Sequence, residues 1–293
     1  MSGSRILIFG YGGVGAALGK RLKGENWSIA ATARIPEAAD ALTAQDVTPL
    51  DPADGAAVAR QIQTIDAVLI TAPPDEAGCP GLEALGPALL GRAAPAPWIG
   101  YLSTTGVYGD HAGRWVFEQT PPAPLSAEAV RRVEAEAAWR TLADSIGASL
   151  AVFRLPGLYG PGRSAFDRLR AGDARRLTKP GHVFSRLHLD DAAAAVAAAL
   201  AHPQVRARPG AIYNLCDDEP APSADVTAHA AYLLGLPVPA EEPVDLAALS
   251  PAGRRFWSET KRVSNAQAKA ELGWRPAYPT YREGLAAILA AGG

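Results

Sequence analysis

The sequence predicts an α/β protein with a doubly wound parallel sheet and a smaller C-terminal lobe that covers the substrate. Three observations favour this fold. Short apolar runs alternate with helical patterns over the first half of the chain, as in a parallel sheet with helices on both faces. A glycine cluster follows the first apolar run. Prolines are frequent between residues 203 and 251, where we expect the loops of the lobe.

The first strand, turn and helix carry the most specific signal. Arg5 to Phe9 is a run typical of a strand buried on both faces, and a helical pattern begins soon after it. The intervening GYGGVG fits the dinucleotide-binding pattern G-x-G-x-x-G. There the first glycine permits a tight turn, the second admits a pyrophosphate, and the third lets helix and strand pack closely. We therefore expect a Rossmann domain with cofactor contacts at Gly10, Tyr11, Gly12, Gly13, Val14 and Gly15.

The later elements follow in order along the chain. The sequence predicts further strands at residues 27–33, 46–50, 67–72, 98–103, 149–155 and 211–215. Apolar residues at helical spacing predict helices at 36–43, 56–63, 82–91, 190–201, 226–234, 265–272 and 281–290, and one with Ala135, Trp139, Leu142 and Ile146 on one face. This order predicts a dinucleotide-binding domain over residues 1–155. Residues 156–293 should form mostly a substrate lobe, with about 187–215 returning to the Rossmann sheet.

Composition and charge exclude several classes of function. The 293 residues carry a net charge of −2 and no basic block, so nothing indicates a nucleic-acid or membrane partner. The two cysteines, Cys79 and Cys216, lie far apart without metal-like spacing, and no metal site is expected. They are typical of thiols in a reducing compartment. We expect a cytoplasmic protein, a monomer or homodimer, whose partner is a small-molecule substrate.

Five later stretches carry a family resemblance. They are LSTTGVYGD at 102–110, RLPGLYGPG at 154–162, SRLHLDD at 185–191 together with IYNL at 212–215, and AELGW at 270–274. In this order they resemble an extended or atypical short-chain dehydrogenase/reductase, near the NAD(P)-dependent epimerase/dehydratase branch. The resemblance covers nearly the whole chain and implies the same Rossmann fold.

The resemblance implies catalytic residues, and here the chain departs from the family. A Ser or Thr three residues before the valine of V-Y-G polarises the substrate oxygen in the family, and Thr104 occupies that position. A hydroxyl at a strand end can equally satisfy local backbone groups. The family base is the tyrosine of Y-x-x-x-K, but no tyrosine occurs between Tyr108 and Tyr159. Arg132 stands in the place of the lysine and Glu128 in that of the tyrosine.

Three proton routes therefore stay open. Glu128 could act as the base, although it is more typical of an exposed partner of Arg132 one helical turn away. A tyrosine from elsewhere, such as Tyr101 or Tyr159, is the second route. A substrate that supplies its own acid is the third. Arg132 can hold the cofactor ribose as a fixed cation, but it does not readily release a proton.

Cofactor choice is indicated at the strand ends. An acidic residue after the second strand favours NAD, whereas Arg34 there suits the 2′-phosphate and favours NADP over NAD. Arg34 could also be loop charge only. Asp51, after the third strand, resembles the family residue near the adenine. We expect Thr71, Ala72 and Pro73, after the fourth strand, to line the nicotinamide ribose.

The substrate is less well defined by the sequence. Sugar-nucleotide relatives use an arginine for a phosphate four residues before the histidine of the SRLHLDD-like stretch, and Phe184 occupies that position here. Tyr159, Arg163 and Arg186 are the substrate-binding candidates, with Lys261 as a further cation. We expect an NADP-binding oxidoreductase or epimerase acting on a hydroxyl or carbonyl of a polar small molecule, with sugar derivatives among the candidates. The alternative is a non-catalytic NADP-binding redox sensor or partner-binding protein.

Overall fold

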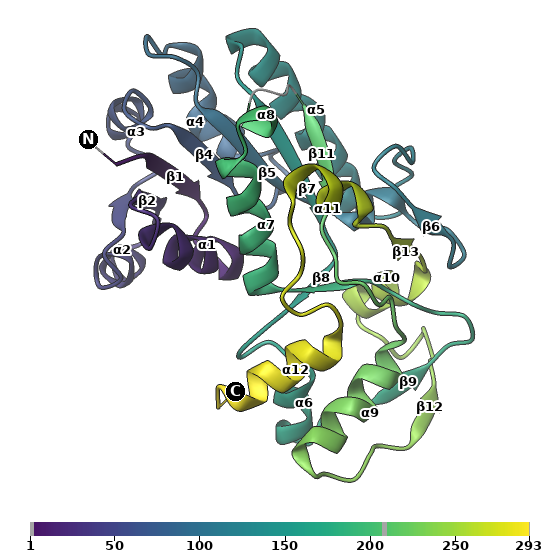
Figure 1. Cartoon of the computed structure of the whole chain (residues 1–293). Coiled ribbons are helices and arrows are strands. Elements are labelled where there is room, and N and C mark those ends of the chain that lie inside the picture. Colours follow the sequence, from purple (N-terminus) through teal and green to yellow (C-terminus); the bar gives the residue numbers. More distant parts are fainter. Residues whose placement is uncertain (1–2, 207–209, 293) are drawn as a thin grey trace.

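The computed structural model describes residues 3–206 and 210–292, and its centre is a seven-stranded parallel sheet (Figure 1). The strand order is β11-β7-β5-β4-β1-β2-β3, so the order reverses beside β1. The sheet strands are β1 (Arg5–Phe9), β2 (Ser28–Thr32), β3 (Thr48–Leu50), β4 (Ala67–Ile70), β5 (Trp98–Thr104), β7 (Leu150–Leu155) and β11 (Ala211–Asn214). Every strand pair in this sheet is parallel, which confirms the predicted doubly wound fold.

The apolar runs form strands because helices cover both faces of the sheet. In β1, Ile6, Leu7 and Ile8 are fully buried, and alternate side chains enter the two different hydrophobic cores. Burying one such side chain contributes about 1.5–3 kcal/mol, so a strand of this composition is stable only in the interior. The sheet therefore requires both helical layers.

The two helical layers are built from different parts of the chain. One face is covered by α1 (Gly13–Lys23), α2 (Pro36–Thr43), α7 (Leu189–Ala201) and α11 (Ala266–Leu272). The other is covered by α3 (Gly55–Ile62), α4 (Pro80–Leu90) and α5 (Ala127–Ile146). Helix α7 lies directly against α1, and its many alanines permit this close approach (Figure 1). Thus α7 and β11, from the second half of the chain, belong to the sheet domain.

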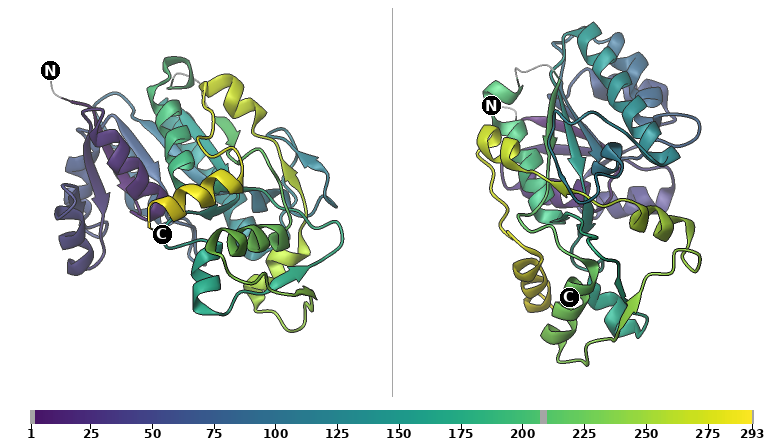
Figure 2. Two further views of the ribbon diagram at one scale, coloured as in Figure 1. Left: turned by 60° about the horizontal axis from the view of Figure 1, so that its bottom comes forward. Right: turned by 90° about the vertical axis from the view of Figure 1, so that its right-hand side faces the viewer.

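The C-terminal lobe lies beyond the ends of the sheet strands (Figure 2). Its helices are α6 (Ala165–Ala171), α9 (Ser223–Leu234), α10 (Pro251–Ser258) and α12 (Tyr281–Ala290). Its own small core contains Phe166, Tyr281 and Leu285. Short two-stranded pairs complete the structure: β8 (Gly157–Tyr159) with β10 (Arg186–His188), β9 (Arg176–Thr178) with β12 (Glu241–Pro243), and β6 (Trp115–Val116) with β13 (Arg262–Val263). The remaining elements are η1 (Thr105–Tyr108) and α8 (Pro203–Arg206).

Most predicted elements lie within a few residues of their observed bounds. The elements that sequence patterns did not indicate are α6, α8, α10, η1 and the short strands outside the central sheet. Two or three residues of strand carry no measurable period. Among the described residues, no helix has both the length and the apolar character needed to cross a bilayer.

Candidate functional site

The three motif glycines serve different purposes in the turn after β1. Gly10 has φ +89°, and a Cβ there would lie 2.8 Å from the Thr71 Oγ1. A Cβ on Gly15 would lie 3.1 Å from the Gly10 carbonyl oxygen, so this glycine is needed for packing between helix and strand. At Gly12, by contrast, an added Cβ would meet no atom within 4 Å. The fold therefore does not require a glycine at 12, and the open space beside it suits a ligand.

Neighbouring strands hold this turn in place. The Gly10 amide donates to the Thr32 Oγ1 at 2.9 Å, and the Thr71 hydroxyl donates to the carbonyl oxygens of Phe9 and Gly10. Gly12 is the N-cap of α1 and provides no side-chain cap. The first-turn amides of α1 and its positive dipole end are thus available to an anion.

A cavity of about 260 Å³ brings the glycine turn together with the predicted catalytic residues. Thr104 and Arg132 are in its wall, as is Arg163. The full lining is Gly12, Gly13, Val14, Thr71, Leu102, Ser103, Thr104, Arg132, Leu155, Pro156, Leu158, Arg163 and Leu189. Of the described residues in this lining, the charged ones are Arg132 and Arg163, both cations. The cavity is therefore suited to anionic ligands.

Thr104 ends β5 and begins η1. Its Oγ1 accepts a hydrogen bond from the Gly106 amide at 3.1 Å, as expected for a hydroxyl that caps a strand end. A hydroxyl carries one donor besides its acceptor sites. Because the Gly106 amide uses an acceptor site, the Thr104 proton stays free to be donated to an oxygen in the cavity. The capping role and a substrate contact are therefore compatible.

Arg132 extends from α5 to the end of β5. Its Nη1 donates to the Leu102 carbonyl oxygen at 2.5 Å and lies 3.4 Å from the Tyr101 hydroxyl. The expected pair of Glu128 with Arg132 is wrong: the Glu128 carboxylate lies 3.3 Å from Arg255 of α10. The reason is that Arg132 donates to the Leu102 carbonyl oxygen of β5, whereas Glu128 lies exposed in the first turn of α5. Burial raises the pKa of Tyr101 to about 12, despite the opposing Arg132.

A buried ion pair behind the cavity was not anticipated from the sequence. Arg154 of β7 donates to both carboxylate oxygens of Glu136, at 3.1 and 2.7 Å, and the Ser103 hydroxyl donates to the same carboxylate at 2.5 Å. The Arg154 guanidinium also lies 4.9 Å from the centroid of the Tyr108 ring. Tyr108 in turn donates to the Asn214 Oδ1 at 2.8 Å. The sequence signal for Glu136 is its place four residues after Arg132, where the resemblance implies a glutamate.

The predicted nucleotide contacts lie along the same edge of the sheet. Arg34 and Asp51 follow β2 and β3 and are exposed, and the Asp51 Oδ1 accepts a hydrogen bond from the Ala53 amide at 2.9 Å. Ala72 and Pro73 follow Thr71 after β4. Because the strands are parallel, these residues share their edge with the glycine turn. Their roles in binding stay predictions.

Tyr159 and Arg186, predicted to bind substrate, do not line the cavity. Arg186 is only 4% exposed, and it donates to the Ala221 carbonyl oxygen at 3.0 Å. A Cβ on Gly284 of α12 would lie 2.0 Å from the Tyr159 hydroxyl, so this ring points into the lobe junction. Burial there raises the pKa of the nearby Asp217 to about 8, opposed by the charge of Arg186. Neither side chain therefore lines the cavity. A substrate contact of Tyr159 or Arg186 stays a prediction.

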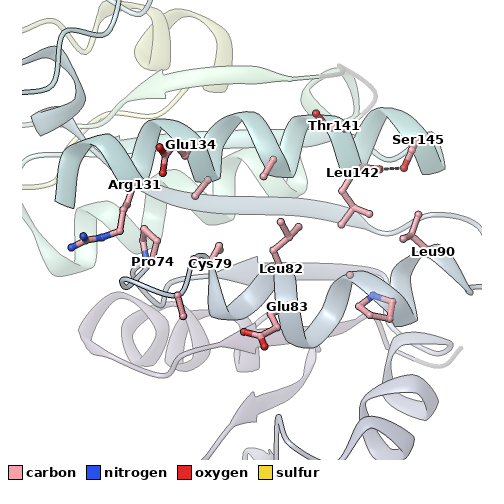
Figure 3. Close-up of a pocket in the computed structure, with 16 residues that line it drawn as sticks. Pro74, Cys79, Leu82, Glu83, Leu90, Arg131, Glu134, Thr141, Leu142 and Ser145 are labelled. Carbon is pink, nitrogen blue, oxygen red and sulfur yellow. Dashed lines mark hydrogen bonds between the residues drawn. The ribbon is translucent and has the colours of Figure 1, made fainter. Parts of the chain in front are cut away.

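A larger groove of about 910 Å³ lies apart from the glycine turn, between α4 and α5 (Figure 3). Leu82 of α4 and Leu142 of α5 point into it (Figure 3). Cys79, at its edge, accepts a hydrogen bond from the Trp139 indole at 3.3 Å. Over residues 3–206 and 210–292, no group of His, Cys, Asp and Glu side chains has the arrangement of a metal site.

Comparison with known sequences gives one family model and several relatives. Residues 90–216 match the model of the NAD dependent epimerase/dehydratase family. Protein YeeZ of Escherichia coli K12 is 30% identical to this chain. The aligned region covers 94% of this chain and 96% of YeeZ. A 3-diazoavenalumate denitrifying reductase from Streptomyces is 36% identical, over 56% of this chain and 54% of that relative's length. This second match therefore spans about half of the relative.

Comparison with solved structures supports the same grouping. A functionally unknown conserved protein from Silicibacter pomeroyi is 45% identical, with a TM-score of 0.89 over 98% of this chain and 99% of its own. A dTDP-glucose 4,6-dehydratase from Bacillus anthracis, solved with NAD, has a TM-score of 0.75 at 18% identity, over 98% of this chain and 96% of that one. The second likeness concerns the fold alone.

The buried ion pair gives a prediction about stability. Replacing Glu136 with Ala leaves the Arg154 charge buried without its partner, and we expect a loss of about 3–5 kcal/mol in the free energy of unfolding. Urea unfolding followed by circular dichroism measures this loss. The control is Glu134→Ala, because Glu134 is exposed on the same helix and should change stability by less than about 0.5 kcal/mol. Equal effects of the two substitutions would contradict a special role for Glu136.

Proposed function

Because this chain belongs to the NAD-dependent epimerase/dehydratase family, we propose that it is an NADP-dependent enzyme acting on a hydroxyl or carbonyl of a polar small molecule. One observation carries the proposal. The open space at Gly12 and the hydroxyl of Thr104 belong to the same cavity, so a dinucleotide bound at the turn would reach the catalytic candidates. The Streptomyces relative is named as a reductase, which supports redox chemistry.

The residues of the turn fit a dinucleotide. The amides of the first turn of α1 would hold the pyrophosphate, where a Cβ on residue 12 would otherwise lie. Arg34 would contact the 2′-phosphate, and Asp51 would lie near the adenine. Thr71, Ala72 and Pro73 would line the nicotinamide ribose. When bound, this cofactor supplies an acceptor or donor of hydride.

The chain's own residues would bind and polarise the substrate. Thr104 would donate its hydroxyl proton as a hydrogen bond to the substrate oxygen. Arg132 would add a fixed positive charge that favours an oxygen carrying developing negative charge. Its guanidinium keeps its proton, so Arg132 contributes orientation and electrostatic stabilisation only.

Among the described side chains of the lining, none is a carboxylic acid, histidine, tyrosine, cysteine or lysine that could transfer the proton. Tyr101 is fully buried with a pKa of about 12, and Glu128 is exposed and paired with Arg255. Of the three routes open in the sequence, a substrate with its own acidic group agrees best with this arrangement. A non-catalytic NADP-binding sensor is the second candidate function, favoured by the missing tyrosine.

The first test concerns the cofactor. If Arg34 contacts the 2′-phosphate, NADPH should bind more tightly than NADH by about 1.5–3 kcal/mol, as for a hydrogen bond between charged groups. Arg34→Ala should remove most of this preference and leave NADH binding almost unchanged, as calorimetry can measure. Arg60→Ala is the control, because Arg60 is equally exposed but lies in α3. Equal affinities for NADPH and NADH in the unmodified protein would refute the assignment.

The second test concerns Thr104. Thr104→Val removes the hydroxyl with little change of volume, and we expect turnover to fall about 10²–10³-fold, as when one preorganised donor is lost. Cofactor affinity should stay the same. Steady-state kinetics should show Glu128→Gln to be nearly neutral, since that carboxylate is exposed and paired with Arg255. Loss of activity in Glu128→Gln with retention in Thr104→Val would reverse these roles. Tight NADPH binding without turnover of any substrate would favour the sensor.

A further inference from the structure

Two aromatic rings form a rigid corner on the C-terminal lobe. Phe184 lies just before β10 and Phe256 lies in α10, and their ring centroids are 4.7 Å apart at an interplanar angle of 78°. We call this pair the aromatic corner. Edge-to-face pairs of this kind are stabilised by the quadrupoles of the rings.

Neighbouring side chains hold the aromatic corner from behind. The Arg186 guanidinium lies 4.3 Å from the Phe184 centroid. The His182 ring lies 5.5 Å from Phe256 and stacks on Trp257 at 4.4 Å. Trp257 is buried at 6% exposure, whereas Phe256 is 39% exposed. The corner is therefore fixed on its inner side and presents ring surface outward.

The aromatic corner lies next to the cavity that holds Thr104. A Cβ on Gly157 would lie 3.9 Å from the Phe184 ring, and Pro156 and Leu158 on either side of Gly157 both line the cavity. The ion pair of Arg255 with Glu128 also brings α10 to the first turn of α5, one turn before Arg132. Two independent contacts thus place the corner near the cavity, although neither ring is part of the cavity lining.

From this arrangement we propose that the substrate is an aryl acid, a planar aromatic ring that carries a carboxylate. The ring would pack on Phe184 and Phe256, and the carboxylate would meet the guanidinium groups of Arg163 and Arg132. The cavity of about 260 Å³ is smaller than the roughly 300–1,000 Å³ of pockets for drug-sized ligands, so the substrate ring would extend beyond it onto the corner. The inference rests on the proposed function, because it names the substrate class of the same site.

The test is calorimetric titration with 4-hydroxycinnamate as the probe, with and without NADPH. Two comparison ligands separate the contributions: 3-cyclohexylpropanoate keeps the carboxylate without an aromatic ring, and UDP-glucose represents nucleotide sugars. We expect 4-hydroxycinnamate to bind most tightly of the three. Phe256→Ala should weaken it by about tenfold, and Phe256→Tyr should largely restore binding, because ring stacking is retained.

Tyr232→Ala is the matched control, since Tyr232 is 76% exposed on α9 and should not affect any ligand. Unchanged NADPH affinity and melting temperature in Phe256→Ala show that the variant is folded; if it is not, Phe184→Leu takes its place with the same expected loss. Tighter binding of UDP-glucose, equal binding of the cyclohexyl acid, or no effect of Phe256→Ala would each overturn the inference. If NADPH binds and 4-hydroxycinnamate does not, the aryl-acid inference fails and the proposed function stands. If NADPH does not bind, the proposed function fails.

Discussion

The buried Glu136–Arg154 ion pair is the interaction on which the candidate site depends. It joins α5 to β7, and the Ser103 hydroxyl adds β5 to the same carboxylate. Two charges in the interior are stable only when geometry and further hydrogen bonds offset the cost of removing them from water. The bidentate contact and the serine provide this here. The ends of two central strands and the middle of a long helix are therefore fixed relative to one another.

This constraint positions both catalytic candidates at once. Thr104 follows Ser103 directly, and Arg132 lies one helical turn before Glu136, so each is adjacent to an anchored residue. A second chain of contacts runs from Arg154 through Tyr108 to Asn214 and ties β11 to the same centre. Function and stability thus share one polar network. Arg132 and Thr104 line the cavity, and α5 carries no tyrosine. No described residue of the cavity lining is an acid.

The part of the structure that is local in sequence could be predicted from sequence. The apolar run of β1, the spacing of the glycines and the helical pattern of α1 lie within about twenty residues, and each signal agrees with the others. The burial of Arg186 could not be predicted from local sequence patterns. Its charge suggested a substrate contact, but the folded lobe encloses it against Phe184 and Tyr281. The roles of Glu136 and Phe256 likewise depend on residues that are distant in sequence.

The most direct test of the account is NADPH binding by Gly12→Val. An added Cβ at residue 12 would meet no protein atom within 4 Å, so the fold should tolerate valine, while the side chain would fill the space assigned to the pyrophosphate. Gly55→Val is the control, because Gly55 also begins a helix and its Cβ would be equally free. We predict an unchanged melting temperature in both variants and loss of NADPH binding in Gly12→Val alone. Retention of NADPH affinity in a folded Gly12→Val would contradict the account.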